Sequence, residues 1–239
     1  MPGKFAVTLA ALAPTGVGAP AEGVRLWWRS LAANAAERES LASLLSDAEH
    51  ARASRFGRPE LRDRYIVGRG TLRVLLGIEL GIEPGAVVIV RGERGRPRVE
   101  SPAIELDFNV SHTAGCAMFA LARRRRVGID IERDDREINA QGIARKFLAP
   151  TERAVLDGHD ADRARRQILR LWTCKEAMSK ATGDGLSAPF RRIDVALAPR
   201  LRLRDGPEPY RPLAWQLLEA PVPAGYVATV ALWERAAGG

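Results

Sequence analysis

Residues 127–132 read VGIDIE and follow a run of four arginines. In an extended strand alternate side chains share a face, so Asp130 and Glu132 point one way. The intervening Ile129 and Ile131 point the other way. The plain interpretation is a half-buried strand with a solvated acidic face. The alternative is that the two carboxylates converge on a bound group.

The same stretch begins the second copy of an internal sequence repeat, which we call the echo. VRLWW at residues 24–28 and VGIDI at residues 127–131 both read as strands, and they start 103 residues apart. The offset recurs between LSDAE at 45–49 and LAPTE at 148–152, which both open helical segments. This repetition indicates an α+β unit that is used twice.

Each half then continues in the same way, with a long helix followed by strands. The helices are expected around residues 61–76 and 164–181, and the strands at 86–90, 106–110, 115–122 and 225–233. We therefore predict an α+β fold of two pseudo-symmetric lobes, with the active site in the cleft between them. The expected division is a flexible leader at 1–22, an N-terminal lobe at 23–124 and a C-terminal lobe at 125–239.

The composition of the chain narrows the class of protein. With 239 residues, 46% of them hydrophobic and 28% charged, it is typical of a soluble globular protein. No stretch approaches the roughly 20 apolar residues of a membrane span, so no membrane partner is expected. Cys116 and Cys174 lack metal-ligand spacing and are predicted to be free thiols in the cytoplasm. The net charge of +8 favours an acidic partner without selecting one.

A second group of charged residues lies in LWTCKEAMSKATGDGL at residues 171–186. Only four of the 37 basic residues are lysines, and two of them, Lys175 and Lys180, occur here beside Glu176. At about 100° per residue these three side chains share one helical arc. The plain interpretation is a surface ion pair between Glu176 and Lys180. Three carboxylates beside two ammonium groups are instead typical of a divalent metal and polyphosphate site.

These two stretches resemble the paired signatures (V/I)G-x-D-(I/V)-E and W-x-x-K-E-(A/S)-x-x-K of the Sfp-type 4′-phosphopantetheinyl transferases. FNVSH at 108–112 is similar to the F-N-x-S-H motif of that family, and RGERGRPRV at 91–99 to its G-K/R-P turn. FLAPTE at 147–152 is similar to its F-(F/L)-x-x-x-E element. The resemblance runs from about residue 24 to the C terminus and implies two pseudo-symmetric α+β lobes, in agreement with the echo.

The resemblance also implies roles for individual residues. Asp130, Glu132 and Glu176 would surround Mg²⁺, with Mn²⁺ as the alternative ion, on the pyrophosphate of coenzyme A. Glu176 would take a proton, directly or through water, from the serine hydroxyl that accepts the transferred group. Lys180 would assist departure of the nucleotide part of coenzyme A. Asp130 is the third residue of the implied catalytic set. The residues implied to bind coenzyme A are Arg52, Arg64, Arg96, Ser111, His112, Lys175 and Lys180.

The implied enzyme is a cytoplasmic monomer that moves the 4′-phosphopantetheine arm of coenzyme A onto a serine of an apo acyl or peptidyl carrier protein. Adenosine 3′,5′-bisphosphate is released, no nucleic acid takes part, and the carrier is expected to dock on residues 141–156. Two alternatives stay open. A non-catalytic nucleic-acid-binding protein would explain the positive charge, although carboxylates repel phosphate unless a metal intervenes. A metal-dependent phosphohydrolase would explain the acids.

Overall fold

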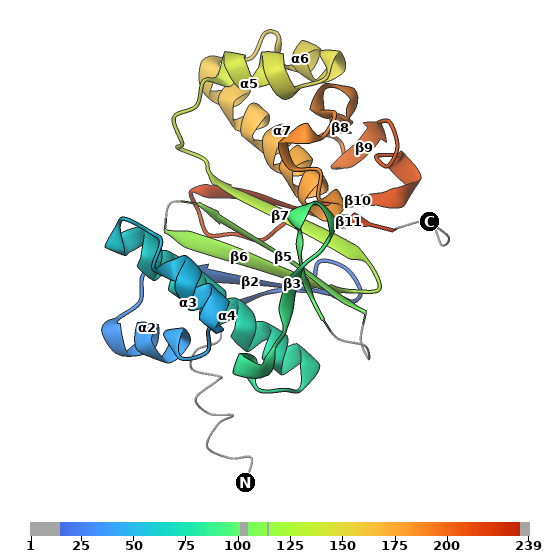
Figure 1. The fold of residues 1–239 in the computed structure, drawn as a ribbon. Helices are drawn as coiled ribbons and strands as arrows, with labels where there is room; N and C mark the ends of the chain where they lie inside the picture. The colour runs from blue at the N-terminus through green and yellow to red at the C-terminus, as the bar shows by residue number, and fades with distance from the viewer. Residues whose placement is uncertain (1–14, 101–104, 114, 235–239) are drawn as a thin grey trace.

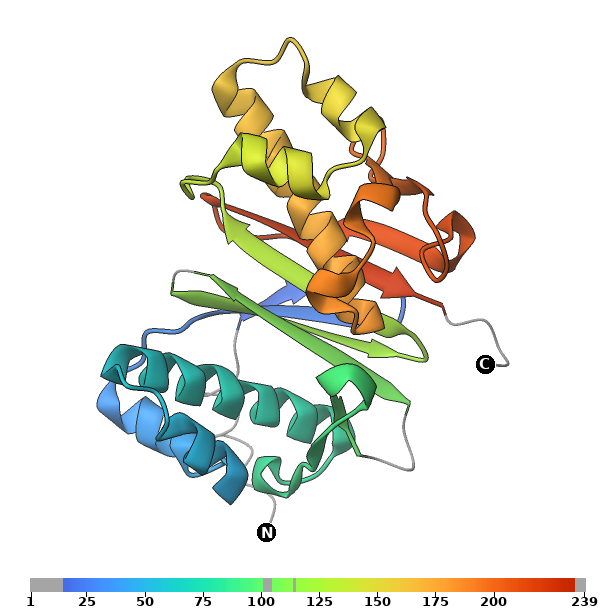
Figure 2. The ribbon, with the colours of Figure 1, turned by 45° about the horizontal axis from the view of Figure 1, so that its top comes forward.

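Two antiparallel sheets lie face to face in the protein, and helices cover the outer face of each (Figures 1 and 2). The computed structural model describes residues 15–100, 105–113 and 115–234. The first sheet has the strand order β1 (Thr15–Gly18), β2 (Val24–Ser30), β6 (Cys116–Arg123), β5 (Leu106–Thr113). The second has the order β10 (Trp215–Glu219), β11 (Tyr226–Trp233), β7 (Arg126–Arg133).

The α-helices of the described residues lie in two groups, one beside each sheet. Beside the first sheet are α2 (Ala35–Ala42), α3 (Asp47–Ala53) and α4 (Pro59–Leu80). Beside the second, α7 (Ala161–Thr182) lies on the sheet, and α5 (Ala140–Phe147) and α6 (Pro150–Leu156) lie farther out (Figure 1). Two short hairpins complete the fold: β3 (Ile89–Arg91) with β4 (Pro97–Val99), and β8 (Asp194–Ala196) with β9 (Arg202–Asp205). None of the described helices combines the length and hydropathy that a bilayer span requires.

The two halves repeat one topology, which confirms the predicted two-lobed α+β fold. The order β2-β6-β5 in the first sheet matches β7-β11-β10 in the second. Helices α4 and α7 both have 22 residues and start 102 residues apart, at 59 and 161. Each ends at a glycine in the left-handed conformation, Gly81 and Gly183, where a residue with a side chain is strained.

The boundary between the lobes stays a prediction, although the chain passes from β6 to β7 between Arg123 and Arg126, where the boundary was expected. Residues 1–14 of the predicted leader lie outside the described residues. Residues 15–18 of that leader form β1, which pairs with β2.

Strand β6 shows why its sequence is an uninterrupted apolar run. Ala117, Phe119 and Leu121 face α4 in the core of the first lobe. Met118 and Ala120 face the second sheet and pack with residues of β7 and β11. Because both faces of the strand are buried, no polar alternation is possible. This central layer joins the two sheets into one structure.

One predicted strand is largely wrong. Residues 86–90 were expected to be extended, but Pro84–Ala86 form a 3₁₀ turn and only Ile89–Arg91 form a strand. The carbonyl groups of Pro84, Gly85 and Val87 turn inward to accept hydrogen bonds from the buried Arg73 side chain. These contacts replace the ladder hydrogen bonds that a strand would have made.

The Arg73 guanidinium belongs to an ion-pair network that fixes α3 on α4. Glu49 closes a capping box with Ser46 at the start of α3, and it accepts hydrogen bonds from Arg69 and Arg73 of α4. Burial alone raises the pKa of Glu49, but the hydrogen bonds from Arg73, Ser46 and Arg69 outweigh it and lower the pKa below its usual value. The ionised carboxylate therefore stabilises the fold.

The lowered pKa leads to a pH-dependent prediction for Glu49→Gln. At pH 7 the free energy of unfolding of this variant should be about 3 kcal/mol lower than that of the wild type, because the substitution breaks a buried ion pair. The stability from Glu49 is present above the pKa of the unfolded state, near 4.3, and is lost as the pH falls through the lower folded pKa. Urea titrations between pH 7 and pH 3 should show the gap between the two proteins narrowing at the acid end. A difference in the free energy of unfolding that is the same at pH 3 and pH 7 would contradict the role of the ion pair. Glu60→Gln, at an exposed position, serves as the control.

Candidate active site

Strand β7 has the alternation that its sequence predicted, and the face that carries Asp130 meets helix α7. Ile129 and Ile131 are buried between the two sheets. Asp130, which is only 5% exposed, lies on the opposite face, under α7. Gly128 is required for this close packing, because a Cβ atom at that position would lie 1.8 Å from the carbonyl oxygen of Ala177. The helix therefore lies directly on the strand that carries the acids.

Strands β5 and β7 are edge strands of different sheets, so no backbone ladder joins them. Side chains of β5 make the connection instead. The Val127 amide donates to Asp107 Oδ2 at 2.8 Å, the Ile129 amide to Asn109 Oδ1 at 3.0 Å, and the Ile131 amide to Ser111 Oγ at 3.3 Å. Alternate residues of β5 thus accept hydrogen bonds from alternate amides of β7. We call this contact between β5 and β7 the seam.

Lys180 of α7 brings the helix to the seam. Its ammonium donates to Asp130 Oδ1 at 2.6 Å, to Ser111 Oγ at 2.9 Å and to the carbonyl oxygen of Ile129 at 3.2 Å. The Ser111 hydroxyl in turn donates to Asp130 Oδ1 at 2.9 Å. The structure therefore brings the predicted residues Asp130, Ser111 and Lys180 together, whereas a contact of Ser111 with coenzyme A stays a prediction.

Glu132 and Glu176 complete the group of acids. Glu132 accepts hydrogen bonds from Thr113 at 3.2 Å and from Arg136. Burial, followed by the Asp130 charge, raises the pKa of both Glu132 and Glu176. Mutual repulsion thus disfavours full ionisation of the group, which a bound cation would relieve.

The acids offer oxygens that fit a magnesium ion. Among the described residues no donor reaches Asp130 Oδ2 or Glu176 Oε1, although both atoms are buried. Within residues 15–100, 105–113 and 115–234, no group of three or more His, Cys, Asp or Glu residues is arranged to hold a metal ion by itself. Mg²⁺ usually binds one or two carboxylates and completes its octahedron with water and substrate phosphate. The two unpaired oxygens match that requirement.

Of the predicted phosphate ligands in the first lobe, His112 lies on a strand of the seam, and Arg64 lies close enough to affect its pKa. His112 follows Ser111 on β5 and points to the other face of that strand. Its side chain is exposed, yet partial desolvation and then the Lys180 charge lower its pKa, with a further contribution from Arg64 of α4. Arg52 of α3 lies over the ring of Tyr65, 5.6 Å from its centroid. Arg64 and His112 are thus brought within electrostatic reach of each other, and their role and that of Arg52 stay predictions.

Lys175 does not belong to this group, which corrects the sequence-based expectation. Its side chain is 0% exposed and makes a 2.8 Å ion pair with Glu152 of α6. It also donates to the carbonyl oxygens of Phe190 and Ile193. The helical arc suggested a shared surface because α7 was assumed to have one buried face. Instead α7 packs on a sheet on one side and on α6 and the Phe190 turn on another.

Arg96 is a second correction, because its guanidinium does not line an open phosphate pocket. It is 8% exposed and makes a bidentate ion pair with Asp107, at 2.6 and 2.7 Å. Its remaining hydrogen bonds go to backbone carbonyl groups of both lobes. The sequence contains a signal for this arrangement, since Asp107 begins the alternating row Asp107, Asn109 and Ser111, but the row becomes meaningful only once β7 lies beside it.

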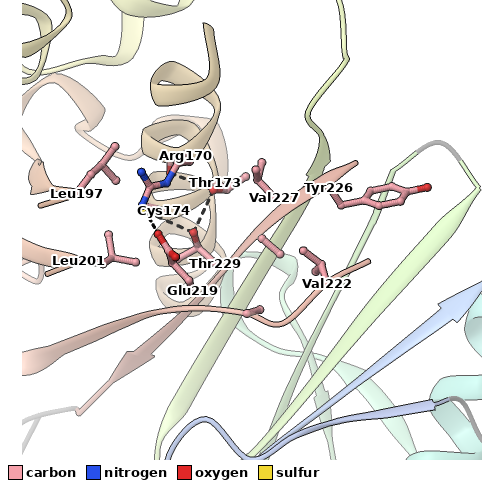
Figure 3. A pocket seen from close by; sticks show the side chains of 12 residues that line it. Arg170, Thr173, Cys174, Leu197, Leu201, Glu219, Val222, Tyr226, Val227 and Thr229 are labelled. Atoms are coloured by element: carbon pink, nitrogen blue, oxygen red, sulfur yellow. Dashed lines mark hydrogen bonds and ion pairs between the residues drawn. The ribbon is translucent and has the colours of Figure 1, made fainter. Parts of the chain in front are cut away.

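One recess of the described structure borders α7, and another lies at the end of β7. One, of about 140 Å³, lies between α7 and β11 with Thr173, Cys174 and Thr229 in its lining (Figure 3), and it contains none of the predicted site residues. Burial raises the pKa of the Cys174 thiol to about 12, so this thiol is inert. The other, of about 320 Å³, is lined by Thr113, Arg133, Asp135 and Arg136 and adjoins Glu132. Sequence reasoning overlooked Arg133 and Arg136, which directly follow the acidic signature.

Comparison with known proteins agrees with this geometry. A family model described as the 4′-phosphopantetheinyl transferase superfamily matches residues 126–231, and one described as 4′-phosphopantetheinyl transferase, N-terminal, matches residues 28–123. The 4′-phosphopantetheinyl transferase HetI of Nostoc sp. is 38% identical over 213 residues, which cover 87% of each chain. The chain belongs to the 4′-phosphopantetheinyl transferase family.

Further relatives of this transferase show more distant similarity. The 4′-phosphopantetheinyl transferase Sfp of Bacillus subtilis is 27% identical over 161 residues, 67% of this chain and 70% of its own. A crystal structure of a holo-(acyl-carrier-protein) synthase from Bacillus anthracis, in complex with CoA (3′,5′-ADP), matches 46% of this chain and 96% of its own, with 22% identity and a TM-score of 0.38. The class of enzyme expected from the sequence signatures is confirmed by the family models and the curated relatives.

The correction at Lys175 can be tested through stability. Lys175→Met leaves the Glu152 carboxylate buried without its partner, so the free energy of unfolding should fall by about 3–5 kcal/mol. The double variant Lys175→Met/Glu152→Gln should recover part of that loss, because no unpaired charge remains. Denaturant unfolding measures both. A Lys175→Met protein of normal stability that binds coenzyme A weakly would instead place Lys175 in the substrate site.

Proposed function

We propose that this transferase moves the 4′-phosphopantetheine arm of coenzyme A onto a serine hydroxyl of an apo carrier protein. The observation that carries the proposal is the ion pair between Lys180 of α7 and Asp130 of β7, with Glu176 within electrostatic reach of both. Two of these side chains keep buried oxygens that no described donor reaches, and the third supplies a cation. Such a site suits a polyphosphate that arrives with a divalent ion.

The proposed reaction is a substitution at the β-phosphorus of coenzyme A. The serine oxygen forms the new bond to phosphorus, the bond to the bridging oxygen of the pyrophosphate breaks, and adenosine 3′,5′-bisphosphate leaves. Glu176 accepts the serine proton, directly or through water, and its raised pKa brings it closer to the working pH of a general base. Lys180 stabilises the charge that develops on the leaving phosphate.

The remaining residues bind and orient the substrate. Asp130, Glu132 and Glu176 would hold Mg²⁺, which neutralises the phosphate oxygens when it is bound, and Mn²⁺ offers the same preference for oxygen ligands. His112, whose lowered pKa favours the neutral ring, donates a hydrogen bond to a phosphate. Arg64 and Arg52 pair with the 3′-phosphate, for which exposed guanidinium groups are suited.

The carrier protein is proposed to dock on residues 141–156, which span most of α5 and all of α6. The aromatic ring of Phe147 packs there against Trp172, with ring centroids 4.8 Å apart. Lys146 adds a positive charge to the same helix, which would attract an acidic carrier. One chain supplies both lobes and the seam, so we propose a monomer that works in the cytoplasm.

The transfer itself is tested by mass spectrometry of an apo carrier protein incubated with coenzyme A, Mg²⁺ and the enzyme. The wild type should add one phosphopantetheine mass to the carrier. Asp130→Asn keeps the shape of the side chain but removes the charge that pairs with Lys180, so its rate should fall by about 10²-fold or more. Asp194→Asn, which breaks a partly buried ion pair with Arg204 in the β8–β9 hairpin, is the matched control and should react normally.

Three outcomes would count against the proposal. A carrier of unchanged mass rejects the transferase function for this chain. Hydrolysis of coenzyme A without a labelled carrier would favour a phosphohydrolase. An Asp130→Asn enzyme that keeps the wild-type rate and metal dependence would reject the assignment of the site.

A further inference from the structure

Arg96 lies in the turn between β3 and β4 and contacts three other elements of the fold. Its Nη atoms donate to both carboxylate oxygens of Asp107 on β5, and Nη2 also reaches the Phe108 carbonyl at 3.2 Å. Nη2 further donates to the Val127 carbonyl of β7 at 2.7 Å. Nε donates to the Lys180 carbonyl of α7 at 2.8 Å. One buried guanidinium therefore joins β5 of the first lobe to β7 and α7 of the second.

The contact with Lys180 has a clear physical reason. Lys180 is in the last turn of α7, where the final four carbonyl groups have no partner within the helix and carry partial negative charge. The Arg96 guanidinium satisfies one of these carbonyls and complements that charge. At its other end, the Lys180 ammonium is held by Asp130 and Ser111. Lys180 is thus fixed at both its main chain and its side chain.

A second ion pair ties the same turn to the same end of α7. Arg94 pairs with Asp184, which follows the C-cap residue of α7. Tyr210 donates to the other carboxylate oxygen of Asp184 at 2.5 Å, so this acid is itself held in place. The β3–β4 turn of the first lobe is therefore bonded, through Arg94 and Arg96, to the C-terminal end of α7.

We propose that Arg96 is a positioning residue of the active site: it sets the place of Lys180 relative to Asp130 and makes no contact with coenzyme A. The proposal rests on the function proposed above. In this chain the planar fork matters because three separate nitrogens, Nε, Nη1 and Nη2, meet these acceptors, whereas the single nitrogen of a lysine occupies only one of those places. Positive charge alone is therefore insufficient at this position.

Steady-state kinetics separate positioning from substrate binding. Arg96→Lys keeps the positive charge, and Asp107→Asn keeps the arginine. Both substitutions should weaken the hydrogen bonding of residue 96 to the end of α7. We expect kcat to fall about tenfold or more in both variants, because small displacements of catalytic groups are costly, while KM for coenzyme A stays within about threefold of the wild-type value. Arg73→Lys is the matched control. Arg73 is also buried, pairs with a carboxylate and contacts three carbonyl groups, but it touches only the first lobe.

Native-state hydrogen exchange of the metal-free enzyme supplies a readout that needs no activity. The amides of residues 181–184 should lose protection in Arg96→Lys and Asp107→Asn and keep it in Arg73→Lys. This measurement stands even if the wild type fails to modify a carrier, which would reject the proposed function alone. Unchanged protection in Arg96→Lys overturns the positioning role. A raised KM for coenzyme A with normal kcat, together with a normal Asp107→Asn enzyme, overturns it in favour of direct substrate contact.

Discussion

The structure depends on the seam, where three side chains of β5 accept hydrogen bonds from three backbone amides of β7. Both are edge strands, and a buried edge with unpaired amides would cost about 1–3 kcal/mol for each lost hydrogen bond. A continuous backbone ladder would have merged the two sheets into one. Side-chain acceptors instead let the sheets remain separate and stack face to face, which leaves the carboxylates of β7 free to meet α7.

This arrangement also explains the electrostatics of the site. Asp130, Glu132 and Glu176 gather like charge in a partly buried place, and burial and mutual repulsion raise the pKa of both glutamates. Lys180 neutralises only part of that charge, through Asp130. An isolated protein gains no stability from such crowding, so the arrangement is better understood as preparation for a cation and an anionic substrate.

The sequence predicted the parts of the fold that have a strong local period. Alternation separated the acids of β7 from its isoleucines, and the 103-residue echo indicated two related lobes. It failed at Lys175 and Arg96, because both side chains are determined by partners distant in sequence. Glu152 is 23 residues from Lys175, and Lys180 is 84 residues from Arg96. A helical arc assigns one buried face, whereas α7 packs on several sides. The places of Lys175 and Arg96 in their motifs therefore did not reveal which side chains and carbonyl groups they contact.

The exchange rate of the Ile129 amide, measured in Asn109→Leu, tests the seam most directly. This substitution keeps the approximate size of the side chain and removes the acceptor of that amide. The free energy of opening at Ile129 should fall by about 1–3 kcal/mol, since the amide loses its partner. Asn34→Leu is the control: it removes the N-cap of α2, which costs about 1 kcal/mol, but leaves the seam intact. Exchange at Ile129 as slow in Asn109→Leu as in the wild type would contradict the account.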